Sequence, residues 1–281
     1  MPAPPKLTDR PALVRARSRA RSGDLFLHEI GADEIQSRLK DVNRTFTAAA
    51  IVTGHPAPWR ARFPDAAIVP DEPTLALSPG AHDLVILGLS LHWSDDMVGQ
   101  MIQARRALRP DGLLLGVTMG GRTLSELRAV LGEAEIAHSG GLSPRVAPMA
   151  EIRDLGALLQ RAGLALPVAD ADLLDVSYAD LHTLAHDLRA MGETNALADR
   201  LRRPTAPAIF RDAAGIYARS FPHRDDPARI RATYEFVYVS GWAPAETQPK
   251  PLRPGTAKAR LADALGTPER PLRDDLPDRE N

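Results

Sequence analysis

Short apolar runs that alternate with helical patterns constrain the fold of this chain more than any other feature. The clearest run is Asp83–Leu89 (DLVILGL), and similar runs occupy Ala48–Thr53, Ala66–Val69 and Leu113–Thr118. Continuous apolar runs of this length are typical of strands that are buried on both faces. Between the runs Asp83–Leu89 and Leu113–Thr118, apolar residues repeat at helical spacing over Met97–Leu108. This alternation predicts an α/β domain with a mostly parallel sheet and flanking helices.

The pattern changes in the second half of the chain. Residues Leu166–Val176 are typical of extended structure, and apolar residues then repeat at helical spacing in Leu181–Met191 and Ile209–Phe221. The segment Arg231–Val239 (RATYEFVYV) alternates between aromatic and polar residues, which is typical of a strand with one buried face. We therefore expect a late, antiparallel strand at the edge of the sheet.

The distribution of residue types divides the chain into three parts. Residues 1–45 are rich in arginine and are expected to be helical over Leu13–Leu39. Residues 46–244 carry the pattern of strands and helices, with a helical insertion at about 178–222. Residues 245–281 are rich in proline and charge and lack apolar periodicity, so we expect a flexible tail.

Charge and residue content argue against several functional classes. The formal net charge is −1, whereas a nucleic-acid-binding domain is usually strongly basic. The absence of cysteine excludes disulfides and thiolate metal ligands and fits a reducing compartment. No apolar run reaches the roughly 18 residues that a transmembrane helix needs. We therefore predict a cytoplasmic protein, and peripheral contact of the basic segment Arg15–Arg21 with a membrane surface or an acidic partner stays open.

Several longer stretches carry a resemblance to a known family. They are LHW (Leu91–Trp93), RRALRPDG (Arg105–Gly112), GGRTLSELR (Gly120–Arg128), GGLSPRVAP (Gly140–Pro148), LRAMGETN (Leu188–Asn195) and GWAP (Gly241–Pro244). The chain resembles class I S-adenosylmethionine-dependent methyltransferases, which implies a Rossmann-like fold. It is more closely similar to the respiratory complex I assembly factor 5 family, whose mitochondrial member acts as an arginine hydroxylase. The malonyl-carrier-protein methyltransferase of biotin synthesis is similar at a greater distance.

The resemblance implies an S-adenosylmethionine site after the first strand, where this chain departs from the family. Gly54 is the only glycine of a loop that is usually glycine-rich, because the backbone there approaches the cofactor closely. Asp71 lies about twenty residues past the first strand, a spacing that would suit a ribose-binding acid at the end of a second strand. The resemblance instead aligns Asp71 and Glu72 with the acidic residues that follow a third strand, near the adenine. It thereby implies that the first helix and second strand are largely deleted between Gly54 and Ala66, and that the ribose-binding acid is missing. We interpret Gly54, Asp71 and Glu72 as a degenerate cofactor site.

His92 is the candidate catalytic residue. It follows the strand Asp83–Leu89, at the edge where open α/β sheets bind ligands, and a histidine there can act as a general base. In the alternative interpretation, His92 hydrogen-bonds a neighbouring carbonyl and Trp93 fills the pocket floor. The candidate contacts to a substrate or partner are Trp93, Gly120, Gly121, Arg122, Tyr178, Arg189, Asn195 and Trp242. The spacing of Thr123 and Glu126 is also that of a helix capping box, which would explain this turn structurally.

No metal site is predicted. His182 and His186 are four residues apart and share a helix face, but the glutamate of an H-E-x-x-H motif is absent, because Thr183 stands in its place.

The resemblance implies a methyltransferase-like protein, with S-adenosylmethionine as its expected cofactor, that takes part in complex I assembly by modifying a protein substrate. Whether it is an enzyme is left open, since arginine hydroxylation needs an oxidant whose ligands the sequence does not reveal. The alternative is an inactive methyltransferase fold that binds an assembly partner, such as a complex I subunit, and no longer binds cofactor. No nucleic-acid partner is expected.

Overall fold

The computed structural model describes residues 6–248 and contains one mixed sheet. Its strands, in the spatial order in which they pair, are β2 (Ala67–Val69), β1 (Ala49–Val52), β3 (His82–Gly88), β4 (Leu108–Met119), β6 (Ile230–Trp242) and β5 (Ala165–Tyr178). The first four of these are parallel to one another, and β6 runs antiparallel to both β4 and β5. The predicted class I methyltransferase-like α/β fold, with a mostly parallel sheet, is confirmed.

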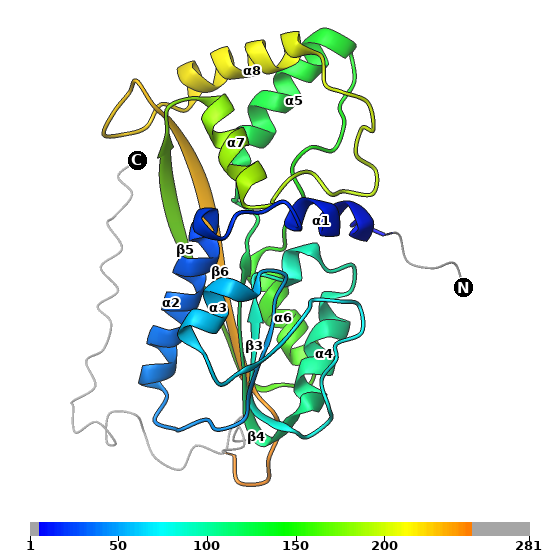
Figure 1. Cartoon of the computed structure of the whole chain (residues 1–281), viewed down its shortest axis with the longest axis vertical. Coiled ribbons are helices and arrows are strands. Elements are labelled where there is room, and N and C mark those ends of the chain that lie inside the picture. The colour runs from blue at the N-terminus through cyan, green and yellow to red at the C-terminus, as the bar shows by residue number, and fades with distance from the viewer. Residues whose placement is uncertain (1–5, 249–281) are drawn as a thin grey trace, which may run out of the picture. The chain divides into compact units, whose positions relative to one another are not determined.

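Helices cover both faces of this sheet (Figure 1). The helices are α1 (Arg10–Arg17), α2 (Phe26–Asp41), α3 (Pro56–Arg62), α4 (Met97–Ala107), α5 (Ser125–Ser139), α6 (Ile152–Arg161), α7 (Leu181–Ala190) and α8 (Pro207–Ser220), with short 3-10 turns η1 (Ser22–Asp24) and η2 (Leu91–Trp93). In Figure 1, α5, α7 and α8 gather at one end of the sheet, and α1 lies between them and the remaining helices.

The core consists of two main layers, one on each face of the sheet. Successive residues of β3 alternate between them: Ile86 packs in the layer that contains residues of α2, whereas Val85 and Leu87 pack with α4 and α6. All three side chains are fully buried. The apolar run of β3 is therefore continuous because both of its faces are covered, as the sequence indicated.

The region predicted to be largely deleted is present in short form. Helix α3 begins at Pro56, and β2 pairs with β1 in parallel register, with Ala67 opposite Ala50. Proline suits the first turn of a helix, where its missing N–H has no intrahelical partner. The helix has only 7 residues, which is why it produced no clear sequence pattern. The strand β2 is the apolar run Ala66–Val69 that the sequence indicated, but it is the second strand and not a third.

The strand β6 is antiparallel, as predicted, but it does not lie at the edge of the sheet. It pairs with β4 on one side and β5 on the other, so β5 forms the edge. The polar residues Thr233 and Glu235, which were expected to face solvent, are buried. The turn that follows β4 covers them, as shown by the hydrogen bond from the backbone N–H of Arg122 to the Glu235 carboxylate.

The helix expected over Leu13–Leu39 is interrupted. Helix α1 ends at Arg17 and α2 begins at Phe26, with η1 and Gly23 between them. The tail predicted for residues 245–281 lies almost entirely outside the described residues, and the three-part division of the chain stays a prediction.

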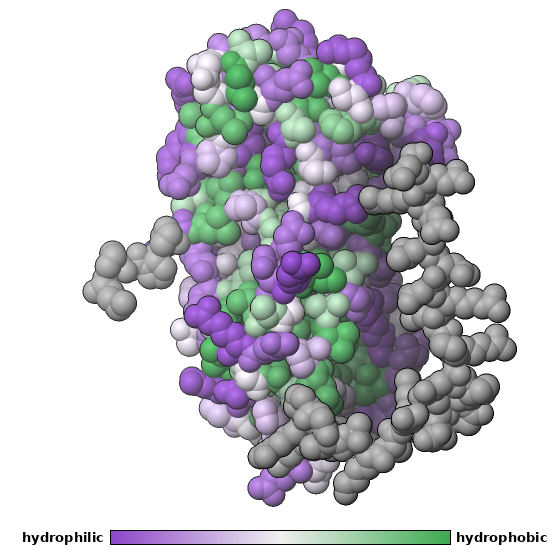
Figure 2. Space-filling model, turned by 180° about the vertical axis from the view of Figure 1, so that it is seen from behind, coloured by the Kyte–Doolittle hydropathy of each residue, from purple (hydrophilic) through white to green (hydrophobic). Residues whose placement is uncertain are grey.

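Among residues 6–248, no helix combines the length and the apolar content that a membrane crossing requires. The surface seen from behind mixes hydrophilic and hydrophobic residues (Figure 2).

Candidate functional site

A pocket lies where the carboxyl ends of the parallel strands meet, the edge at which open α/β sheets bind ligands. Its cavity volume is about 40 Å³. Its walls are mainly apolar and include Leu27, Met119 and Met191, whereas His28, His92 and Glu193 contribute polar groups. A concave, mostly apolar pocket with a few convergent polar groups is typical of a ligand site.

The two signature positions of a cofactor site line a separate hollow, together with Arg10 and Arg17. Gly54 follows β1, and Asp71 follows β2, the strand that neighbours β1. Asp71 therefore does not follow a third strand, as the resemblance implied. It lies at the end of the strand beside β1, which is where nucleotide-binding α/β folds place their ribose-binding acid. That acid is present, and the prediction that it is missing is wrong.

The guanidinium group of Arg17, from α1, occupies the space between these two residues. Its Nη1 donates to both carboxylate oxygens of Asp71, at 2.8 and 2.9 Å, and both side chains are buried. A Cβ atom built on Gly54 would collide with the Arg17 guanidinium. Arg10 adds a hydrogen bond of 2.7 Å to the Asp71 carbonyl. Glu72 is half-exposed and lies 3.7 Å from Arg10.

As arranged here, these residues do not fit S-adenosylmethionine. The close approach that Gly54 would allow to a cofactor is used by Arg17, and the carboxylate of Asp71 already has its hydrogen-bond donors.

His92 and Trp93 belong to η2 and are both buried, and His92 lines the pocket. The Nε2 of His92 is 3.8 Å from Oε2 of Glu193, and Nε1 of Trp93 donates to the same oxygen at 2.8 Å. Among the described residues His92 makes no hydrogen bond to a carbonyl, so the alternative expected for it is not observed. Trp93 packs with Leu13 and Ala147, and thus contributes both to the core and to the orientation of Glu193.

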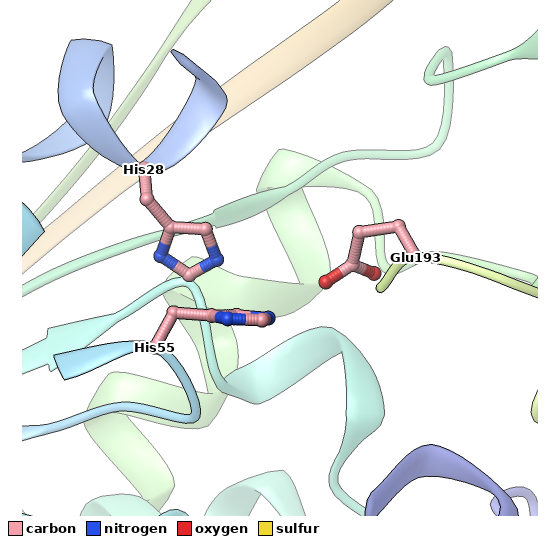
Figure 3. A group of neighbouring side chains, drawn as sticks. All are labelled: His28, His55 and Glu193. Atoms are coloured by element: carbon pink, nitrogen blue, oxygen red, sulfur yellow. The ribbon is translucent and has the colours of Figure 1, made fainter. Parts of the chain in front are cut away.

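Two further histidines converge on Glu193. His28 comes from α2, His55 precedes α3, and Glu193 follows α7; Figure 3 shows the three side chains pointing toward one another. One nitrogen or oxygen from each lies within 4.8 Å of the others. The ring of His28 is 4.7 Å from that of His55, and Nε1 of Trp59 donates to Nδ1 of His28 at 3.2 Å.

Burial sets the charge of these groups. Burial lowers the pKa of His28 well below its ordinary value, with a smaller contribution from His55, and burial also lowers the pKa of His55. Burial alone would raise the pKa of Glu193, but the neighbouring imidazole of His92 and the charge of Arg17 outweigh it and hold this pKa below its ordinary value. At neutral pH the cluster thus holds two neutral imidazoles and one carboxylate.

The glycines expected to face a ligand instead allow close packing. A Cβ on Gly120 would collide with the Glu235 carboxylate, and one on Gly121 with the Glu151 carboxylate. The side chain of Arg122 is exposed. Neither glycine lines the pocket. Gly120 permits the turn after β4 to lie against β6, and Gly121 permits it to lie against Glu151 at the start of α6.

The capping box expected at α5 is not formed. Leu124 occupies the N-cap position. The hydroxyl of Thr123 accepts a hydrogen bond from the Glu235 N–H, and the Glu126 carboxylate accepts one from the Thr233 hydroxyl at 2.5 Å. Both side chains therefore tie the start of α5 to β6.

The remaining candidates lie apart from the pocket. The Tyr178 hydroxyl donates to Asp187 at 2.7 Å, and burial raises its pKa above the ordinary value. Arg189 is exposed, and the Asn195 amide donates to the Pro144 carbonyl. Trp242 pairs with the first half of β4, at the opposite end of the sheet. The site residues that the sequence interpretation missed are Arg17, His28, His55 and Glu193.

Comparison with characterised proteins finds relatives over much of the chain. This chain is 36% identical over 204 residues to "Arginine-hydroxylase NDUFAF5, mitochondrial" of Danio rerio, and the match covers 72% of this chain and 62% of that protein. It is 37% identical over 204 residues to the Homo sapiens protein of the same name, and this match covers 72% of this chain and 57% of that protein. It is also 33% identical over 181 residues to the malonyl-[acyl-carrier protein] O-methyltransferase of Xylella fastidiosa, covering 64% and 58%. The matches thus span about half of the length of these relatives. No protein-family model matches the sequence.

A solved structure with a similar arrangement is that of a Bacillus halodurans protein described as a putative methyltransferase, with a TM-score of 0.48 and 12% identity over 75% of this chain and 99% of that chain. One correction follows from the relatives. The NDUFAF5 proteins are named as mitochondrial, and this finding overturns the prediction of a cytoplasmic protein.

Proposed function

The chain belongs to the class I methyltransferase-like superfamily, and on that premise we propose that it takes part in the assembly of respiratory complex I by modifying a protein substrate. The observation that carries this proposal is the similarity to the arginine hydroxylase NDUFAF5 at 36–39% identity, over as much as 72% of the chain. The proposed site is the pocket at the carboxyl ends of β3 and β4.

We favour hydroxylation of an arginine side chain over methyl transfer, with dioxygen as the oxidant and an external two-electron donor as the reductant. One oxygen atom would be inserted into a C–H bond of the side chain, and the other would leave as water with two electrons and two protons from the reductant. The matched methyltransferases imply S-adenosylmethionine use among the relatives, but in this chain Arg17 occupies the space beside Gly54. The apolar walls of the pocket suit the methylene stem of a long side chain, because such a stem packs on apolar surface while its polar head stays apart. The polar groups of His28, His92 and Glu193 then lie where the head of that side chain would be modified.

Two residues have defined roles in this proposal. Trp93 is a positioning residue, since its N–H fixes one oxygen of Glu193. His92 is buried and lines the pocket, and its Nδ1 has no hydrogen-bond partner among the described residues. His92 can therefore hold or release a proton at Nδ1.

Complementation of a gene deletion tests the proposal. Cells that lack the gene should assemble less complex I, and the wild-type gene should restore assembly. We expect Glu193→Gln and His92→Gln to fail, whereas His182→Gln, which changes an exposed histidine of α7, should restore assembly fully. If both pocket variants restore assembly while folding normally, the inactive binding protein is the better description.

A further inference from the structure

The cluster of His28, His55 and Glu193 has the composition of a metal site. Three elements that are distant in the sequence each contribute one residue, and the side chains converge on a common point (Figure 3). Both histidines are almost completely buried, at 3% and 5% exposed. A chain rarely buries several ionisable groups together unless they are paired or bind a common partner.

The protein itself leaves part of this cluster unsatisfied. Among the described residues, Nε2 of His55 and Oε1 of Glu193 are buried without a hydrogen-bond partner. The other oxygen of Glu193 is fixed by Trp93 at 2.8 Å, so the free oxygen has a defined direction. Because an unpaired buried polar atom is costly, a bound group that uses both atoms would remove that cost.

We propose that His28, His55 and Glu193 bind one divalent first-row transition-metal ion. Two imidazole nitrogens and one carboxylate oxygen are the donors of non-haem iron(II) sites, which leave coordination positions open, and zinc accepts the same donors. Ligand atoms on one such ion lie about 2.1 Å from it, so the three donors must draw together somewhat from their separation of up to 4.8 Å. Iron(II) is the ion to which this donor set points.

The charges around the cluster partly balance. The positive charge of Arg17 lowers the pKa of both histidines and would also act on a bound cation, but its guanidinium is paired with the Asp71 carboxylate. Glu193 keeps a net negative charge on the cluster. The pocket borders His28 and Glu193, so the open positions of the ion would be accessible from it.

One contact opposes metal binding. Because Trp59 donates to Nδ1 of His28, the proton of the neutral ring lies on Nε2. To bind an ion through Nε2, the ring must move that proton to Nδ1 and lose the hydrogen bond to Trp59. Replacing Trp59 with Phe removes this competition, and metal binding should then become up to about tenfold tighter.

Metal titration of the full, untagged chain tests the proposal without reference to any protein substrate. After removal of metal with a chelator, calorimetry with Zn(II), and with Fe(II) under anaerobic conditions, should show one ion bound per chain with a Kd below about 10 μM. Co(II) should give a visible absorption band from histidine and carboxylate coordination. The isosteric variant Glu193→Gln and the variant His55→Gln should each weaken binding at least about 100-fold.

His182→Gln is the matched control, because it removes an exposed histidine outside the cluster, and it should bind as the wild type does. Circular dichroism confirms that each variant is folded. If the ligand variants do not fold, the Co(II) spectrum of the wild type and the tighter binding of Trp59→Phe decide the question. Absence of binding by the wild type, or equal binding by both ligand variants, would overturn the proposal. Normal binding without any effect of the variants on complex I assembly would leave the metal site standing and refute the proposed function instead.

Discussion

The substitution Arg17→Ala tests whether this arginine excludes S-adenosylmethionine. The wild type should bind the cofactor with a Kd above about 100 μM. Removing the guanidinium opens the space beside Gly54 and frees the carboxylate of Asp71, both of which a bound nucleoside would use. We expect the Kd to fall at least about tenfold, a gain of about 1.4 kcal/mol in binding free energy.

The same substitution should lower the stability of the fold. Asp71 is 4% exposed and accepts two short hydrogen bonds from Arg17, so the variant leaves a buried carboxylate without its main partner. Loss of one partner of such a pair typically costs about 3–5 kcal/mol. Arg10 remains nearby, 3.4 Å from the carboxylate, so we expect the lower end of this range.

Arg10→Ala is the control for both effects. It removes a contact to Asp71 but leaves the Arg17 guanidinium beside Gly54, so it should cost stability without strengthening cofactor binding. Calorimetry with S-adenosylmethionine and urea unfolding provide the two measurements. The reasoning is refuted if the wild type already binds at low micromolar Kd, or if Arg17→Ala binds no better than Arg10→Ala.

Three further predictions concern stability. Glu135 is buried against Arg145, and the hydrogen bonds from Arg145 lower the pKa of Glu135 to about 2. This pair should therefore stabilise the fold by about 3 kcal/mol above pH 4.5 and lose that contribution as the pH falls toward 2. Urea unfolding of Glu135→Gln should show a weaker pH dependence between these two pH values. Trp93→Ala should cost about 3–5 kcal/mol of unfolding free energy, since Trp93 is only 5% exposed, and an unchanged melting curve would contradict its place in the core. Gly120→Ala should cost about 1–3 kcal/mol because its Cβ would meet a buried carboxylate, whereas Gly141→Ala, which meets nothing within 4 Å, should be nearly neutral in thermal unfolding.

The strands of the sheet could be predicted because each long parallel strand is apolar on both faces. The helix α3 could not, since 7 residues are too few to show a clear period. The strand β2 was indicated by the run Ala66–Val69, but the resemblance counted it as a third strand, and Asp71 was therefore placed after the wrong strand. The position of β6 was missed for a different reason: its polar residue Glu235 is buried by a turn more than a hundred residues away in sequence.

The polar cluster at the pocket had no local signal in the sequence. His28, His55 and Glu193 each come from a different element, so no spacing within one helix or strand brings them together. The pair His182 and His186 does have such a spacing, but both side chains are exposed. Glu193 lies within a stretch that resembles the family. His92 does too, and its place after the strand Asp83–Leu89 was a second indication.

The most direct test of the proposed function is mass spectrometry of complex I subunits. The samples should come from cells with the wild-type gene, cells without it, and cells that carry Glu193→Gln. We predict that an arginine-containing peptide of one subunit carries one added oxygen atom in the wild type alone. An added methylene group at that peptide, or the same modification in all three samples, would contradict the account.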